Sequence, residues 1–349
     1  MVQWKMSPEE RRKKARLLSR PVKQLRLTRN TKVADLVEDF ASTSIQARRL
    51  GQAARIYLRM LEDDKEPVIF LGLAGPLIAA GQRQVIADLI SRNYVDVVVS
   101  TGAILYQDMY QAFGGLHYEG SPDMDDVELE KMNVDRIYDT LVDDELFIKF
   151  DHLIGDFAGA LEPGVYSSRR FLHALAGEVK DRDSILRSCR DRDVPMFSPA
   201  LNDSSIGIGL TRHYSAVPDP KKRLILDSIL DNVEIMRIIC EARATSAVYV
   251  GGGTPKNFVN DAVVMAHLEH GSKVPGHEYA IQLTMAQPTD GGLSGSTLSE
   301  AKSWGKVAHE ATVSLAHVEA SIGLPLVAAY VIGKGGKRRA RRLGRMFKG

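Results

Sequence analysis

Cysteine and tryptophan are the rarest residues of this 349-residue chain, which has two of each. Two cysteines, Cys189 and Cys240, are too few for a disulfide framework or a cysteine metal site, and we expect no metal. No apolar run approaches the roughly 18 residues that a membrane-spanning helix needs. The N-terminus is positively charged but has no hydrophobic stretch behind it, so it is unlike a secretory signal. These absences favour a cytoplasmic protein without a membrane partner.

Charge is divided unevenly along the chain. Residues 1–30 hold ten Lys and Arg against two Glu, and residues 334–349 hold eight Lys and Arg with no acidic residue. Because the total net charge is only +2, the body between them is acidic. An acidic body attracts a small cationic substrate, although the same pattern also serves solubility alone. The basic ends contain no recognisable nucleic-acid-binding module, so we expect no nucleic-acid partner.

The hydrophobic pattern predicts an α/β fold with a doubly wound, mostly parallel sheet and helices on both faces. Residues 1–30 form a basic arm in which "SPEERRKKARLLSR" predicts a short helix, and residues 31–64 predict two helices broken near 42–44. After them, short apolar runs alternate with helix-length segments, which is typical of buried parallel strands. These runs are 67–75, 95–103, 194–201, 246–255, 279–286 and 322–333. We therefore expect one catalytic domain over 31–333, followed by a disordered basic tail over 334–349.

Glycine-containing turns follow several of the apolar runs, at 72–76, 101–103, 251–253 and 290–295. Ligands of a doubly wound sheet bind at the carboxyl ends of its strands. The segment "VYVGGGTPKNF" has the order of a phosphate-binding turn, although it has neither a GxGxxG fingerprint nor the ending of a P-loop. One such turn is more often a tight connection than a nucleotide site, but several on one sheet favour a dinucleotide.

The second tryptophan stands in "SEAKSWGKVAHEAT", residues 299–312, two positions before Lys306. A free lysine side chain has a pKa near 10.4 and is a poor nucleophile at neutral pH. In a desolvated pocket beside a large aromatic ring, a lysine loses its proton more readily and attacks carbonyl and imine carbons. The alternative is that Trp304 fills a core and that Lys306 is a solvated charge.

Seven segments in unbroken order resemble the deoxyhypusine synthase family. They are "ASTSIQARRLGQA", "VDVVVSTGA", "DRIYDTLV", "VPMFSPALNDSSIG", "VGGGTPKN", "TMAQPTDGGLSG" and "SEAKSWGK". The resemblance runs from about residue 31 to about residue 330, and it implies that NAD is the cofactor. It implies transfer of an aminobutyl group from a polyamine, spermidine or putrescine, through an imine on a lysine to an amine acceptor. It also implies a homotetramer.

The same resemblance implies roles for individual residues. Lys306 would be the nucleophile, Glu300 would anchor a substrate ammonium, and Trp304 would wall the pocket. Asp290, Gly291 and Leu293 would lie near the reacting amine. The NAD contacts would be Gly75, Pro76, Leu77, Thr101, Gly102, Ala103, Asp203, Gly252, Met285, Ala286, Glu319 and Ala320.

The substrate-binding positions depart from the family pattern. Tyr106 and Gln107 replace a pair of glutamates, Ile208 replaces an aspartate, and Asn257 replaces a histidine. Each buried charge-assisted hydrogen bond is worth about 1.5–3 kcal/mol, so these losses are large enough to change the substrate. They favour a small-amine acceptor, as in homospermidine formation, over a lysine of the hypusine-bearing translation factor. A third hypothesis, a non-catalytic NAD-binding homologue, is disfavoured by the intact "SWGK".

Overall fold

The computed structural model describes residues 6–271 and 274–347. Its centre is a six-stranded sheet in the order β11-β10-β9-β1-β2-β7, in which every neighbouring pair is parallel. The strands are β1 Val68–Leu73, β2 Val97–Ser100, β7 Met196–Phe197, β9 Thr245–Val250, β10 His277–Thr284 and β11 Val307–His317. The chain starts at β1, adds β2 and β7 on one side, and returns to place β9, β10 and β11 on the other. This order confirms the doubly wound prediction.

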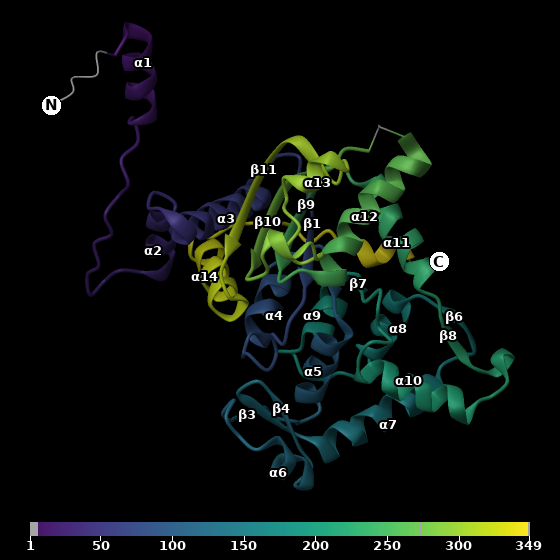
Figure 1. Cartoon of the computed structure of the whole chain (residues 1–349). Coiled ribbons are helices and arrows are strands. Elements are labelled where there is room, and N and C mark those ends of the chain that lie inside the picture. Colours follow the sequence, from purple (N-terminus) through teal and green to yellow (C-terminus); the bar gives the residue numbers. More distant parts are fainter. Residues whose placement is uncertain (1–5, 272–273, 348–349) are drawn as a thin grey trace.

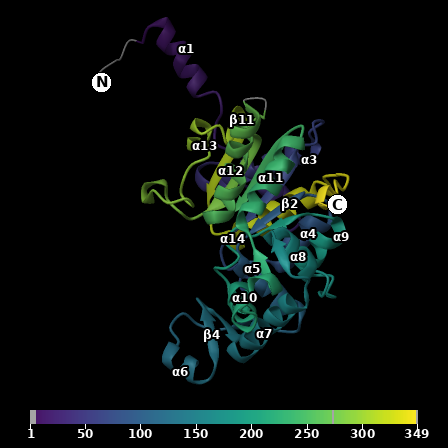
Figure 2. The same ribbon diagram turned by 90° about the vertical axis from the view of Figure 1, so that its right-hand side faces the viewer.

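Helices cover both faces of the sheet, and the alternation of side chains along the strands shows why. In β1, Ile69 and Leu71 pack into one buried cluster, whereas Val68 and Phe70 pack into another. The first cluster contains residues of α3, α4, α9 and α14, and the second contains residues of α11 and α12. Figure 2 shows α11 and α12 side by side. Continuous apolar runs thus form strands that are buried on both sides.

The helices occupy the segments between and around these strands. They are α1 Pro8–Leu17, α2 Val33–Phe40, α3 Ile45–Glu62, α4 Arg83–Ser91, α5 Gly102–Ala112, α6 Asp126–Lys131, α7 Asp144–Ala160, α8 Ser168–Leu175, α9 Ile185–Arg192, α10 Ser205–Ala216, α11 Ser228–Glu241, α12 Gly253–His270, α13 Glu300–Ser303 and α14 Ala320–Gly333. Short 3-10 turns are η1 Pro220–Lys222, η3 Pro288–Asp290 and η4 Leu343–Phe347. Within the described ranges, no helix combines the length and the apolarity that crossing a membrane requires.

Two small sheets lie outside the central one. β3 Tyr118–Glu119, β4 Val134–Ile137 and β5 Thr140–Asp143 form an antiparallel sheet, and β6 Gly164–Tyr166 pairs in parallel with β8 Leu224–Leu226. The antiparallel sheet and the helix α6 lie between α5 and α7 in the sequence. Among the described residues, no group of three or more His, Cys, Asp or Glu is placed to hold a metal ion.

The N-terminal arm contains the expected basic helix. Ser7 caps α1, and Glu10 closes a capping box with its side chain on the backbone N–H of Ser7. No residue of α1 is buried, and Figure 1 shows the helix standing away from the body of the protein. The predicted break between the next two helices is also confirmed, because α2 ends at Phe40 and α3 begins at Ile45.

The expected strand at 322–333 is wrong, because this segment belongs to the helix α14. A twelve-residue apolar run is long for a strand, and the buried residues Leu324, Val327, Ala328 and Val331 recur at helical spacing. The sixth strand is instead β11, which the apolar pattern misses. Its segment "VAHEATVSLAH" is mostly only half-buried, and its first half carries His309 and Glu310 on the surface.

The expectation of a disordered C-terminal tail is also wrong for residues 334–347. Arg338 reaches into the body, where its guanidinium pairs with Asp96 at 2.5 Å. These side chains are 4% and 2% exposed, so the pair is buried. Farther along, Phe347 packs under the guanidinium of Arg169. The ion pair with Asp96 holds this part of the basic tail against the body of the protein.

Candidate functional site

The glycine-containing turns after β1 and β9 meet at the carboxyl ends of these two central strands. β1 and β9 are neighbours where the chain reverses direction across the sheet, which is where doubly wound sheets hold ligands. A Cβ on Gly251 would lie 2.7 Å from the carbonyl oxygen of Ala74. Gly251 also has a φ of +76°, so glycine is required there both by space and by backbone conformation.

The residues expected to contact NAD follow the carboxyl ends of all six strands. They are Gly75, Pro76 and Leu77 after β1, Thr101, Gly102 and Ala103 after β2, Asp203 after β7, Gly252 after β9, Met285 and Ala286 after β10, and Glu319 and Ala320 after β11. At this edge, α5 begins behind Thr101, which makes no side-chain capping bond to the described residues. A helix start with free N–H groups suits an anionic ligand.

A separate cavity lies beside α12, and we call it the Lys306 cavity. It measures about 190 Å³. It is lined by Lys256, Asn257, Asn260, Gly291, Gly292, Leu293, Ser296, Glu300, Ala301, Trp304 and Lys306. The loop that covers it touches the glycine turn after β9, because Ser294 Oγ accepts a hydrogen bond of 2.9 Å from Gly253 N–H. The cavity and the expected cofactor edge are therefore connected by one loop.

Lys306 lines this cavity. Its Nζ lies 2.8 Å from Asp261 Oδ1, 3.5 Å from Asn257 Oδ1 and 5.4 Å from the ring centroid of Trp304. The lysine side chain is 15% exposed, whereas that of Asp261 is 44% exposed. The lysine nitrogen thus has one carboxylate partner and one aromatic ring beside it, with little contact with solvent.

The local sequence explains how Lys306 reaches this position. α13 has only four residues, and Gly305 adopts a φ of +69° that turns the chain into β11. The backbone of Lys306 is fixed on both sides, since its N–H donates to Ala301 O and its C=O accepts from His277 N–H. The lysine backbone is therefore anchored where β10 and β11 begin.

Sequence reasoning missed a second lysine in the cavity. Lys256, in the first turn of α12, is only 2% exposed, and its Nζ donates to Leu293 O at 3.2 Å and to Ser296 Oγ at 3.0 Å. Burial lowers the pKa of Lys256 to about 8, Glu300 opposes this shift, and the charge of Lys306 adds to it. The signal was present in the segment "GGGTPK", in which a lysine comes three positions after the last glycine of the turn. Asp261, the partner of Lys306, was also missed.

The structure brings most of the predicted substrate-binding residues together. Asn257, Gly291, Leu293, Glu300 and Trp304 line the Lys306 cavity, and Asp290 is the residue before Gly291. Trp304 is 63% exposed and so forms an open wall rather than a core contact. The alternative in which Trp304 fills a core therefore does not apply.

Besides Asp290, three predicted substrate-binding residues do not line this cavity. Tyr106 is buried in α5, where its hydroxyl donates to Phe147 O at 2.8 Å. Gln107 is 8% exposed, and its Oε1 accepts a hydrogen bond from Ala79 N–H. Ile208 lies on α10 and is 60% exposed. Within one chain, Tyr106 and Gln107 are packed against the body of the protein on α5, whereas Ile208 is exposed to solvent.

Comparison with known proteins identifies the family. A family model described as deoxyhypusine synthase matches residues 35–331. The chain belongs to the deoxyhypusine synthase family. It is 40% identical over 331 residues to a "Deoxyhypusine synthase-like protein" of Chlorobaculum tepidum, covering 93% of each chain. It is 41% identical to a protein of the same description from Coxiella burnetii, covering 96% of each chain.

An archaeal relative and two solved structures extend this comparison. "Probable deoxyhypusine synthase 2" of Archaeoglobus fulgidus is 41% identical over 295 residues, which are 84% of this chain and 96% of that one. A crystal structure from Entamoeba histolytica, assigned as a deoxyhypusine synthase, superposes with a TM-score of 0.61 at 17% identity over 91% of this chain and 99% of that one. AgrE, solved with ornithine and NAD⁺, gives a TM-score of 0.50 at 14% identity over 84% of this chain and 34% of AgrE. At these identities the two structures establish the fold.

Proposed function

We propose that this family member is an NAD-dependent aminobutyl transferase that acts on a polyamine and uses a small amine as the acceptor. The observation that carries the proposal is Lys306, which is held in a small cavity between the Asp261 carboxylate and the Trp304 ring. Membership of a transferase family supports the same reaction class.

The residues of the Lys306 cavity have separate roles in the proposed amine transfer. Glu300 at the rim would hold a substrate ammonium, and the Trp304 face would stabilise the same cation by a cation–π contact. Lys306 must lose a proton before its nitrogen attacks the substrate carbon, and the Asp261 carboxylate at 2.8 Å is placed to receive that proton. The attack forms a C–N bond to Lys306 as the diamine leaving group departs, and the acceptor amine then displaces the lysine.

The residues at the carboxyl edge of the sheet fit a dinucleotide. Gly75 has a φ of +97° and open space where a Cβ would point, so the turn after β1 leaves room at the switch point. The N–H groups at the start of α5 would face the pyrophosphate, and Asp203 is exposed beside them. NAD, when bound, supplies the oxidation of the amine carbon and the final reduction of the transferred imine.

The size and charge of the Lys306 cavity support a small acceptor. A volume of about 190 Å³ suits a short amine chain. Glu300 is the one carboxylate among its described lining residues and Asn257 is neutral, so fewer anionic groups are available than a long polycation would pair with. The alternative acceptor is a lysine of the hypusine-bearing translation factor.

We also propose that a second copy of the chain completes the site. Trp304 and Ile208 are large apolar residues that are 63% and 60% exposed within one chain. The homotetramer expected from the family resemblance would cover them. Analytical ultracentrifugation of wild type and Ile208→Arg tests this: the variant should dissociate and lose turnover. A fully active monomer would contradict it.

Turnover with defined amines tests the proposed reaction. The protein is incubated with NAD and labelled spermidine, with putrescine or the translation factor as the acceptor, and released 1,3-diaminopropane and labelled product are measured. Lys306→Ala should reduce turnover by at least about a thousandfold while keeping the fold. Lys302→Ala, which removes a lysine of the same segment, is the matched control. If the translation factor is labelled and no labelled small amine forms, the acceptor is a protein lysine and the small-acceptor proposal is wrong. If no 1,3-diaminopropane is released, the transfer itself is refuted.

A further inference from the structure

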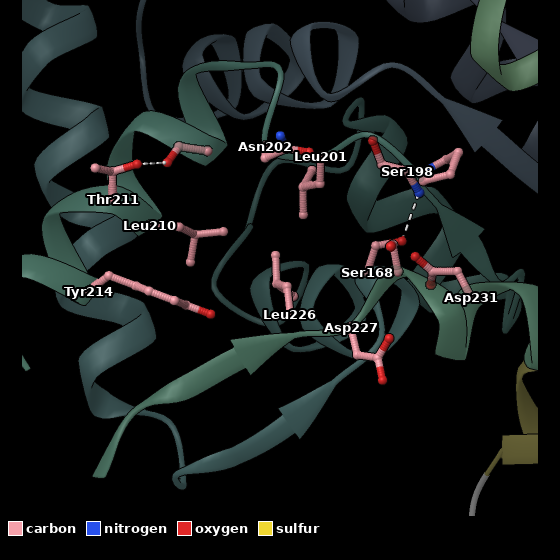
Figure 3. Close-up of a pocket in the computed structure, with 13 residues that line it drawn as sticks. Ser168, Ser198, Leu201, Asn202, Leu210, Thr211, Tyr214, Leu226, Asp227 and Asp231 are labelled. Carbon is pink, nitrogen blue, oxygen red and sulfur yellow. Dashed lines mark hydrogen bonds between the residues drawn. The ribbon is translucent and has the colours of Figure 1, made fainter. Parts of the chain in front are cut away.

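A second cavity lies on another part of the molecule, and we call it the Asp231 cavity. It measures about 380 Å³, which is within the range of small-molecule sites. Its walls come from the loop after β7, from α10, from β8, and from the first turns of α8 and α11. Figure 3 shows Leu201, Leu210 and Leu226 converging on the space from three sides, with Tyr214 at one end and Ser168 and Asp231 at the other.

The charge of this lining has one sign. Asp227 and Asp231 contribute carboxylates, and none of the described lining residues is a lysine, arginine or histidine. The rest of the lining is apolar or carries hydroxyl and amide groups. An anionic ligand is therefore disfavoured, and a cation with an apolar body matches both parts of the lining.

Asp231 is the group that points to a ligand. It is 1% exposed, and within the described part of the chain its Oδ2 has no hydrogen-bond partner. Its Oδ1 accepts one bond of 3.3 Å from Arg169 N–H. The hydroxyl oxygen of Ser198, also 1% exposed, has no partner among these residues either. Buried polar atoms are nearly always satisfied, so two orphans in one cavity need an explanation.

The nearest arginine does not neutralise Asp231. The guanidinium of Arg169 is held by Glu234 in a two-point pair at 2.6 and 2.8 Å. Burial raises the pKa of Asp231 to about 7, and the neighbouring Glu234 adds to the shift, while the nearby Ser168 and the backbone N–H of Arg169 oppose it. The Asp231 carboxyl group is thus buried at a cost in charge solvation, and no cation of the described residues forms an ion pair with it.

We propose that the Asp231 cavity binds a protonated amine, with the ammonium on Asp231 and an alkyl chain or ring between the three leucines. An ammonium supplies the donors that Asp231 Oδ2 and Ser198 Oγ lack. The site is distinct from the Lys306 cavity, because the two share no lining residue. An amine that binds here would not need to react.

Calorimetric titration of the full chain with n-hexylamine tests the proposal, with 1-hexanol and hexanoate as the neutral and anionic probes of equal length. Asp231→Asn should weaken hexylamine binding by at least about tenfold. Leu210→Trp keeps the carboxylate but fills the cavity, and it should have the same effect. Glu241→Gln removes an exposed carboxylate from the same helix as a matched control.

The double variant Lys306→Ala, Glu300→Gln separates this site from the proposed active site, and it should still bind hexylamine as wild type does. Four results would overturn the proposal: no hexylamine binding to wild type, equal binding of hexanol, binding unchanged in both cavity variants, or binding lost in the double variant. The last result would place the amine in the Lys306 cavity. It would leave the proposed function intact.

Discussion

The buried ammonium of Lys256 makes the stability of this protein depend on pH in a defined way. Its pKa falls from an ordinary value of 10.5 to about 8 in the folded protein. Between these two values the unfolded chain binds the proton more tightly than the folded chain, so the free energy of unfolding rises with pH. Below pH 8 the penalty is fully present, and above 10.5 it is gone. At about 1.4 kcal/mol per pKa unit, the rise is about 3 kcal/mol.

Lys256→Met isolates this contribution. The substitution also removes hydrogen bonds to Leu293 and Ser296, but their loss is nearly independent of pH and shifts the whole curve. Urea unfolding at fixed protomer concentration, from pH 7 to pH 10.5, gives the two curves. Wild type should gain about 3 kcal/mol relative to the variant across this window. Lys180→Met, at an exposed position, provides the baseline for removing a surface lysine. Parallel wild-type and Lys256→Met curves would refute the reasoning.

Three further outcomes follow from the same geometry. Arg338→Met removes the closest cation from the buried Asp96 carboxylate and leaves only Arg341 among the described residues, at 3.8 Å, so it should cost about 3–5 kcal/mol in urea unfolding. Arg339→Met, at an exposed neighbouring position, should change little, and an equal cost for both variants would contradict the buried pair. Glu300→Gln should weaken binding of the polyamine by about 1.5–3 kcal/mol in calorimetry, and unchanged affinity would remove Glu300 from the site. Trp304→Leu should weaken it by about threefold to thirtyfold, and no loss would exclude a cation–π contact.

The sequence alone predicts the strands that are buried on both faces. The runs at 67–75, 95–103 and 246–255 are short, apolar and followed by glycine, and each of them forms a parallel strand of the central sheet. β11 escapes this reasoning because it is mostly half-buried and carries polar residues. α14 is mistaken for a strand because its run is apolar on all sides, so the sequence shows no helical period, although its buried residues recur at helical spacing.

The site residues likewise fall into those that the sequence predicts and those that it does not. Lys306, Trp304 and Glu300 stand within seven residues of one another, so their proximity is visible in the sequence. Asp261 is 45 positions before Lys306, and the two meet only because α12 packs beside the start of β11. The burial of Lys256 has the same origin, since its hydrogen-bond partners lie on the loop after β10. Pairings of this kind depend on the tertiary structure and leave no local pattern.

Trapping with borohydride and mass spectrometry tests the central claim most directly. The protein is incubated with NAD and, in separate reactions, with spermidine, putrescine, homospermidine or agmatine, then reduced and digested. Aminobutyl transfer through Lys306 predicts a four-carbon amine adduct on the peptide that contains Lys306, and this adduct should be absent from Lys306→Ala. An adduct on Lys256 instead would show that Lys256, and not Lys306, is the nucleophile. No adduct with any of the amines, from folded protein that binds NAD, would contradict aminobutyl transfer through a lysine.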